Sequence, residues 1–139
     1  MVNTRCVSLL EEALAEAHAR GLVAQGPFKY GWLGKWILAH TEPPSMHKYK
    51  APLAFTPVSG QPKNSVLPAF RLLQQQLALQ LEKANGLDLE HIKVRAPEAR
   101  MLRFNLVLTF TWIAAHERRH LWQARQVRAR LCSTSQSCA

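Results

Sequence analysis

The clearest pattern in the first part of the chain is an apolar stripe with helical spacing over residues 8–20, SLLEEALAEAHAR. Glu11, Glu12 and Glu16 lie off that stripe, and Gly21 follows as a stop signal. An amphipathic α-helix is therefore predicted here. The stripe consists of Leu9, Leu10, Ala13, Leu14 and Ala17.

A second helical pattern begins at Asn64 or Ser65, either of which is a suitable N-cap, and has Pro68 in its first turn. It is expected to end at Asn85-Gly86, because glycine after asparagine is a typical helix terminator. Its apolar positions are Val66, Phe70, Leu73, Leu77, Leu81 and Ala84.

Between these two helices, residues 21–63 contain six of the eight prolines, and four glycines follow Gly21 in this range. Only one short apolar patch, GWLGKWILAH, interrupts this composition. We expect a long, partly ordered connection with one short helix. A connection of this length is unusual in a compact domain and indicates a loop that covers or borders something.

The last helix is expected to open at Pro97 and to continue to about Arg128. On a wheel of about 100° per residue, Arg100, Arg118 and Arg125 fall opposite an apolar stripe. That stripe consists of Leu102, Leu106, Thr109, Ile113, His116, His120, Gln123 and Val127. Both imidazoles are expected to point toward it, one turn apart, where they can converge on one metal ion. The alternative is two interior histidines that hydrogen-bond to partners such as Thr109 or Gln123.

Length and composition indicate a single globular domain over residues 1–131, followed by a frayed polar tail at 132–139. Hydrophobic residues make up 47% of the chain and charged residues 19%, which is within the globular range. The longest apolar stretch, FNLVLTFTWIAA, is shorter than the roughly 20 residues of a membrane span, and we expect no secretory signal. A cytoplasmic protein with no membrane partner is expected. Cys6, Cys132 and Cys138 are expected to be free thiols.

The charge of the chain is +9 and is concentrated toward the C-terminus. From Lys93 onward, nine Lys or Arg residues face only Glu98 and Glu117. Such asymmetry is compatible with a nucleic acid or another polyanion as partner. Solvated arginines on the outer face of a long helix are the favoured interpretation, because neither a run of basic residues nor interleaved aromatics is present.

The segment HERRH, residues 116–120, has the His-Glu-x-x-His form of zinc peptidases, with Glu117 where a general base would lie. Such peptidases need a third protein ligand, usually on a later segment, and no His, Asp or Glu follows His120. Two arginines also occupy the middle positions. A peptidase is therefore disfavoured.

The stretch AAHERRHLWQARQV resembles the closing motif of the DinB-like (DinB/YfiT) superfamily, in which a final helix carries His-x-x-x-His followed by Leu-x-Gln. His116, His120, Leu121 and Gln123 match that motif. The segments EEALAEA, PFKYGWLGKW, EPP, KYKAPLAFTP and LRFNL are similar to one subgroup, so the resemblance covers nearly the whole chain. It implies an all-α protein, an up-and-down four-helix bundle with a divalent metal commonly bound by three histidines at one end of the core.

The sequence departs from the family at both ends, since the C-terminal LCSTSQSCA lacks the subgroup's Gly-Phe-Pro-like ending. Family members also begin with a further helix and supply the first metal-binding histidine upstream of EEALAEA, whereas MVNTRCVSL contains none. We therefore expect an incomplete bundle of three main helices plus a short one, with the third ligand missing and apolar surface exposed. We therefore expect the chain to be a fragment or the product of a misplaced start codon, or a homodimer partner to supply the helix. His18, His40, His47 and His91 are expected to be surface or loop histidines.

The resemblance implies a metal-dependent enzyme, a thiol-dependent transferase, isomerase or hydrolase whose small-molecule substrate stays open. Zn, Ni, Mn or Fe would act as a Lewis acid on a low-molecular-weight thiol such as bacillithiol or mycothiol. Arg119 is the candidate for binding an anionic group of the cofactor, and Gln123 for supporting the histidines. The alternatives are a metal-free helical remnant or interaction domain, and a polyanion binder that uses the basic C-terminal helix, with nucleic acid less favoured.

Overall fold

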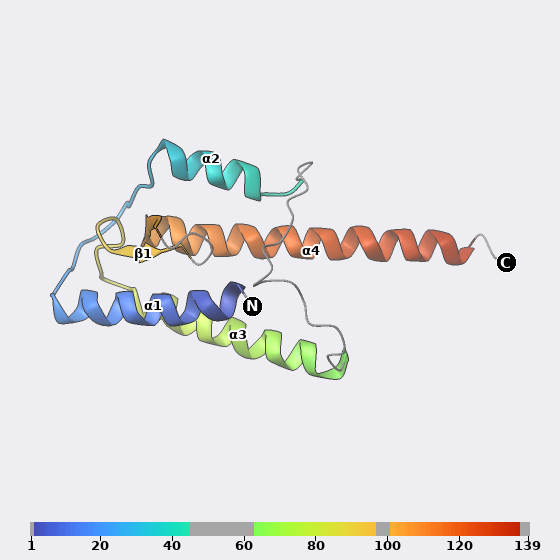
Figure 1. Cartoon of the computed structure of the whole chain (residues 1–139), viewed down its shortest axis with the longest axis horizontal. Helices are drawn as coiled ribbons and strands as arrows, with labels where there is room; N and C mark the ends of the chain where they lie inside the picture. Colours follow the sequence, from blue (N-terminus) through green and yellow to red (C-terminus); the bar gives the residue numbers. More distant parts are fainter. Residues whose placement is uncertain (1, 45–62, 97–100, 137–139) are drawn as a thin grey trace. The chain divides into compact units, whose positions relative to one another are not determined.

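The computed structural model describes residues 2–44, 63–96 and 101–136, most of which are helical (Figure 1). The helices are α1 (Val2–Ala19), α2 (Trp32–Thr41), α3 (Lys63–Lys83) and α4 (Leu106–Gln136), and β1 (Lys93–Arg95) pairs with β2 (Arg103–Asn105). A mainly helical protein is thus confirmed, with one small antiparallel sheet in addition. Within the described ranges, no helix has both the length and the apolar character needed to span a membrane.

The chain divides into two compact units, which are described separately. Unit 1 contains α1, α3, the β1–β2 hairpin and the start of α4 as far as Phe110. Unit 2 contains α2 and the part of α4 from Thr111 onward. The remainder of the proline-rich connection, residues 45–62 with His47, lies outside the described residues.

The core of unit 1 forms where α1 packs against α3 and β1. The α1 helix begins earlier than the pattern at 8–20 predicts, because Cys6 and Val7 extend its buried face toward the N-terminus. Burial of this apolar surface is the main source of stability for such a helix pair. The buried residues include Leu10, Leu14, Ala17, Leu77, Ala84, Ile92, Val94 and Leu106.

Both helix stops that the sequence predicts in unit 1 are confirmed. Gly21 has φ 61°, and hydrogen bonds from Leu22 N to Ala17 O (3.0 Å) and from Gly21 N to His18 O (3.1 Å) form a Schellman motif. Gly86 has φ 79° after the end of α3. Side chains with a Cβ rarely adopt these angles, so glycine is required at both positions.

The predicted start of the last helix is wrong. Lys93–Arg95 and Arg103–Asn105 pair as strands ahead of the helix, with Arg95 opposite Arg103 and Ala96 N donating to Leu102 O at 2.8 Å, while Pro97 itself lies outside the described residues. The α4 helix begins at Leu106 because Asn105 caps it, its Oδ1 accepting Leu108 N–H at 2.9 Å. Leu102 consequently lies outside the helix. At the other end, α4 continues to Gln136, past the expected end near Arg128.

The short helix expected in the connection is α2. Within unit 2, the C-terminal end of α2 is bonded to two arginines of α4. Arg119 Nη1 donates to the carbonyl of His40 at 3.1 Å. Arg118 binds the Glu42 carboxylate with its Nε at 3.0 Å and with Nη2 in a second, short bond. These contacts lie beside the middle of α4.

Candidate metal centre

The two histidines singled out by the sequence lie together on α4. Their Nε2 atoms are 3.1 Å apart, and the rings meet edge to face with centroids 4.4 Å apart. A spacing of four residues brings side chains of one helix face into contact, which explains this convergence. The pair is therefore a local property of α4 and needs no other element to form it.

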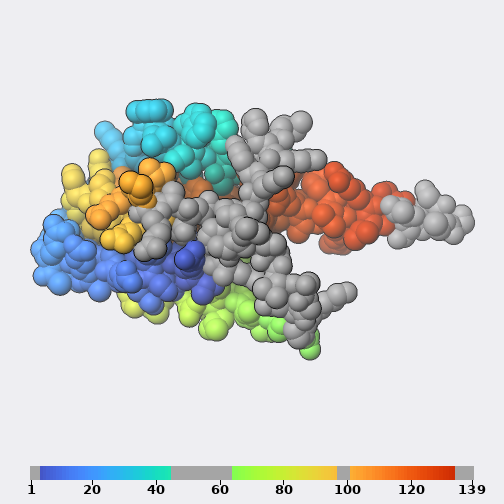
Figure 2. Space-filling model, in the orientation of Figure 1, coloured from blue at the N-terminus to red at the C-terminus, as the bar shows by residue number. Residues whose placement is uncertain are grey.

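The two rings differ in burial, and this corrects the expectation that both point into an apolar stripe. The stripe is buried at Thr109 and Ile113, His116 is half-buried, and His120 and Gln123 are exposed. The described part of α2 ends at Thr41, with its polar contacts to α4 at Arg118 and Arg119. From His120 to Ser133, α4 is therefore exposed except at the half-buried Trp122 (Figure 2).

His116 is held in a fixed orientation and in its neutral form. Its ring stacks on Trp112, with centroids 4.9 Å apart and planes inclined by 18°. Burial, followed by the nearby charges of His120 and Arg119, lowers the pKa of His116 to about 4. The ring is therefore uncharged at neutral pH, as a metal ligand must be. Its Nδ1 is buried and has no hydrogen-bond partner among the described residues.

Gln123 lies within hydrogen-bond distance of His120, a contact that both the metal-site interpretation and the alternative of hydrogen-bonded histidines allow. The distance from His120 Nδ1 to Gln123 Oε1 is 3.0 Å, and an amide oxygen only accepts, so Nδ1 carries the proton. The lone pair of the neutral ring is then on Nε2, which faces His116. Hydrogen bonds of this kind fix the tautomer of metal-binding histidines in proteins.

The geometry of the pair fits two ligands of one metal ion. Two imidazole nitrogens that bind a tetrahedral ion at ~2.0–2.1 Å lie about 3.3 Å apart. The observed separation of 3.1 Å is close to this value, so small side-chain rotations suffice. Without metal, His116 Nε2–H can donate to His120 Nε2, and the same distance then represents a hydrogen bond.

The described residues supply no third ligand. Among them, no group of three or more His, Cys, Asp or Glu residues could hold a metal ion. Three other histidines have partners of their own: His18 contacts Lys83 O, His40 contacts Trp36 O and His91 contacts Asp88. Glu117 is half-buried on α4 and belongs to no such group.

The two arginines of HERRH have roles that the sequence did not predict. Arg119, the expected binder of an anionic cofactor, is half-buried and donates to the His40 carbonyl. Arg118, expected to be solvated, pairs with Glu42. The hydrogen bond from Arg118 lowers the pKa of Glu42, and the pKa of Arg118 is raised in return. The separation of 76 residues between the partners explains why no local signal indicated the pair.

Comparison of the chain with protein-family models, with curated proteins and with solved structures finds no match.

Proposed function

We propose that His116 and His120 bind a divalent transition metal, Zn, Ni, Mn or Fe, through their Nε2 atoms. The observation that carries this proposal is the 3.1 Å separation of the two nitrogens. Two further features support it. His116 is kept neutral by burial, and Gln123 holds the proton of His120 on Nδ1, so the Nε2 lone pair of His120 is free to coordinate; His116 coordinates through Nε2 once its single proton is on Nδ1.

On the resemblance of the motif His116, His120, Leu121 and Gln123, we further propose that the chain is a DinB-like domain protein and a metal-dependent transferase or hydrolase. The ion, when bound, supplies Lewis-acid chemistry that favours the thiolate of a low-molecular-weight thiol. The residues of this chain divide the remaining tasks. Trp112 fixes the buried ligand, Gln123 orients the exposed one, and the exposed side of His120 leaves room for a small substrate.

The test is elemental analysis of the purified chain beside His116→Ala and His120→Ala, with His91→Ala as control. His91 is an exposed histidine of unit 1 that pairs with Asp88, and its removal should leave bound metal unchanged. We expect close to one metal ion per site in the wild type and in the control, and loss of the ion in both α4 variants. Absence of metal after incubation with Zn or Ni at neutral pH would refute the proposal.

A second candidate, a polyanion binder, is supported by the exposed C-terminal half of α4. Arg125 and Arg128 are exposed there, and no Asp or Glu follows Glu117. A protein that neutralises phosphates loses affinity steeply as salt rises. Salt-dependent retention on a nucleic-acid or heparin column, removed by Arg125→Gln with Arg128→Gln, would favour this candidate over the metal enzyme.

A further inference from the structure

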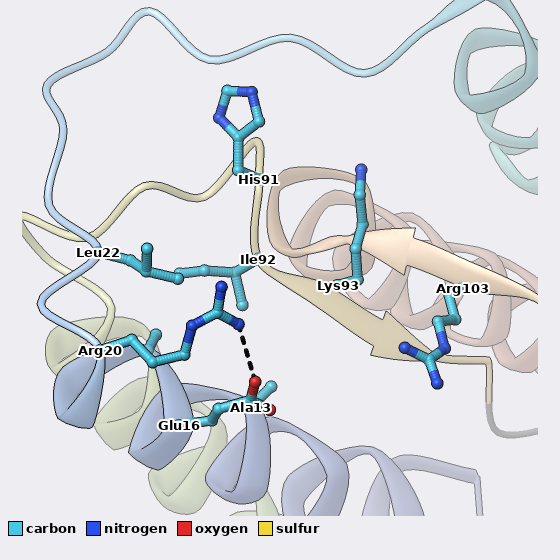
Figure 3. Close-up of a pocket in the computed structure, with 9 residues that line it drawn as sticks. Ala13, Glu16, Arg20, Leu22, His91, Ile92, Lys93 and Arg103 are labelled. Carbon is cyan, nitrogen blue, oxygen red and sulfur yellow. Dashed lines mark hydrogen bonds and ion pairs between the residues drawn. The ribbon is translucent and has the colours of Figure 1, made fainter.

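Unit 1 contains a small pocket between the last turns of α1 and the β1–β2 hairpin (Figure 3). Its volume is about 160 Å³, which is below the ~300 Å³ of the smallest typical ligand sites. It is therefore suited to one small polar group, with any larger part of a ligand lying outside it. Ala17, Leu22 and Ile92 contribute apolar surface, and Arg20, Lys93 and Arg103 contribute positive charge.

The carboxylates around this pocket already have donors. Glu16, the acidic residue in the lining, pairs with Arg20 at 2.9 Å. Asp88 pairs with His91 at 2.8 Å, and Glu90 accepts a backbone N–H from another loop at 3.2 Å. Among the described residues, none of these three carboxylates forms an ion pair with Lys93, Arg95 or Arg103.

Three cations share one face of the hairpin. Lys93 and Arg95 are exposed on either side of the buried Val94, and Arg103 lies directly opposite Arg95 in the register. Like charges at directly opposed positions destabilise a strand pair. Lys93 Nζ donates to a backbone carbonyl at 3.3 Å, and within the described ranges neither Arg95 nor Arg103 has an acidic partner. A bound anion would remove this repulsion.

Arginine side chains reach this pocket from two sides, Arg20 from the end of α1 and Arg103 from β2. Figure 3 shows Arg103 extending from β2 toward α1, the side on which Arg20 and Glu16 lie, while Lys93 and His91 point away from α1. Guanidinium groups match the oxygens of a phosphate in fork-like pairs. A pocket with net positive lining also concentrates anions.

We propose that this pocket binds a dianionic phosphate group, held by Arg103 and Arg20 in the field of Lys93 and Arg95. The phosphate is either free or the head of a small monoester whose organic part rests on Leu22 and Ile92. This site lies in unit 1 and does not depend on the metal proposed for unit 2.

The experiment follows the backbone amide signals of the full-length ¹⁵N-labelled chain by NMR during titration with inorganic phosphate and, separately, with phenyl phosphate. We expect saturable shifts at Arg20, Ile92 and Arg103. Tighter binding of phenyl phosphate would assign the site to a monoester, and equal binding would assign it to free phosphate. Shifts that do not saturate, or that spread evenly over the basic part of α4, would overturn the proposal.

Variants separate this site from general charge effects. Arg103→Gln should weaken binding about tenfold or more, because it removes a charge-assisted hydrogen-bond donor. Glu16→Gln should strengthen binding severalfold, since it removes the negative charge and releases Arg20. Such a gain cannot result from misfolding. Arg125→Gln, an exposed arginine of unit 2, is the matched control and should bind as the wild type does.

A metal ion in unit 2 could also take up phosphate, so the titration is repeated on His116→Ala. Unchanged shifts in unit 1 would support the pocket whatever the fate of the metal proposal. Loss of the unit 1 shifts in that variant would refute the pocket, because the variant changes no residue of its lining.

Discussion

Gln123 Oε1 accepts a hydrogen bond from His120 Nδ1–H across 3.0 Å, and this bond leaves the Nε2 lone pair of His120 facing His116. The relationship makes Gln123 a positioning residue for the proposed metal. Gln123→Ala should lower metal affinity about 10- to 100-fold, as loss of such a partner does in other metal sites. A competition titration against a chromogenic chelator measures the change.

Two further variants make this prediction specific. Gln123→Glu keeps an acceptor for Nδ1–H and should retain or raise affinity. Gln76→Ala removes an exposed glutamine of α3 and serves as the control. Equal affinity in the wild type and Gln123→Ala would show that the hydrogen bond does not orient the ligand.

The pKa of His116 gives the metal-free protein a defined pH dependence. An unfolded histidine has a pKa near 6.5, and the folded His116 has a pKa of about 4, lowered by burial and by the charges of His120 and Arg119. Between these values the unfolded chain binds a proton that the native chain does not. Protonation of His116 therefore favours the unfolded chain in this range. As a result, the free energy of unfolding is highest above about pH 6.5 and falls as the pH decreases toward 4. The loss should be on the order of 2 kcal/mol, because solvent around the half-buried ring screens part of the full effect of the lowered pKa.

Urea denaturation at several pH values tests this expectation. In His116→Gln, the free energy of unfolding should fall less steeply between pH 6.5 and 4 than it does in the wild type. His18→Gln, an exposed histidine in α1, should keep the slope of the wild type. An identical slope in His116→Gln would show that another group causes the loss of stability.

Asn105 joins the hairpin to α4 and should be sensitive to substitution. Its Oδ1 accepts Leu108 N–H at 2.9 Å, and its Nδ2 donates to Lys29 O at 2.9 Å. Asn105→Ala should lower the free energy of unfolding by about 1–2 kcal/mol, the usual cost of losing an N-cap. Asn105→Asp keeps the capping oxygen and loses the Nδ2 donor, so its stability should lie between that of the wild type and that of Asn105→Ala. Asn85→Ala, an exposed position, is the control, and a loss of equal size there would contradict the capping role.

Gln80 is buried between α1 and α3 at 1% exposure, with its Nε2 bonded to Glu11 Oε1 at 3.1 Å. Its Oε1 has no partner among the described residues. Glu11→Ala leaves the buried Nε2 unpaired and should cost about 1–3 kcal/mol of unfolding free energy. Gln80→Met removes both polar atoms and should stay within about 1 kcal/mol of the wild type.

Thermal and chemical denaturation measure the stability of Glu11→Ala and of Gln80→Met. Glu12→Ala, at the exposed neighbouring position of α1, should leave stability nearly unchanged. If Gln80→Met is less stable than Glu11→Ala, the shape of the side chain decides stability at this position. An unpaired buried polar atom would then not be the main cost.

The features that the sequence predicted correctly are those that neighbouring residues decide. Helical spacing identified α1 and α3, and the glycines at 21 and 86 marked their ends because their left-handed backbone angles require glycine. The contact between His116 and His120 is also decided locally, since side chains four residues apart on a helix lie next to each other on the same face.

Only the tertiary structure decided the features that depend on distant partners. Strands of three residues carry almost no local signal, so the hairpin and the later start of α4 at Leu106 depend on pairing between Lys93–Arg95 and Arg103–Asn105. The pairing of Arg118 with Glu42 and the meeting of Arg20 with Arg103 at one pocket each join segments more than 70 residues apart. The unequal burial of His116 and His120 has the same origin. The sequence by itself placed both histidines on one helix face, and how much of that face other elements cover is a property of packing.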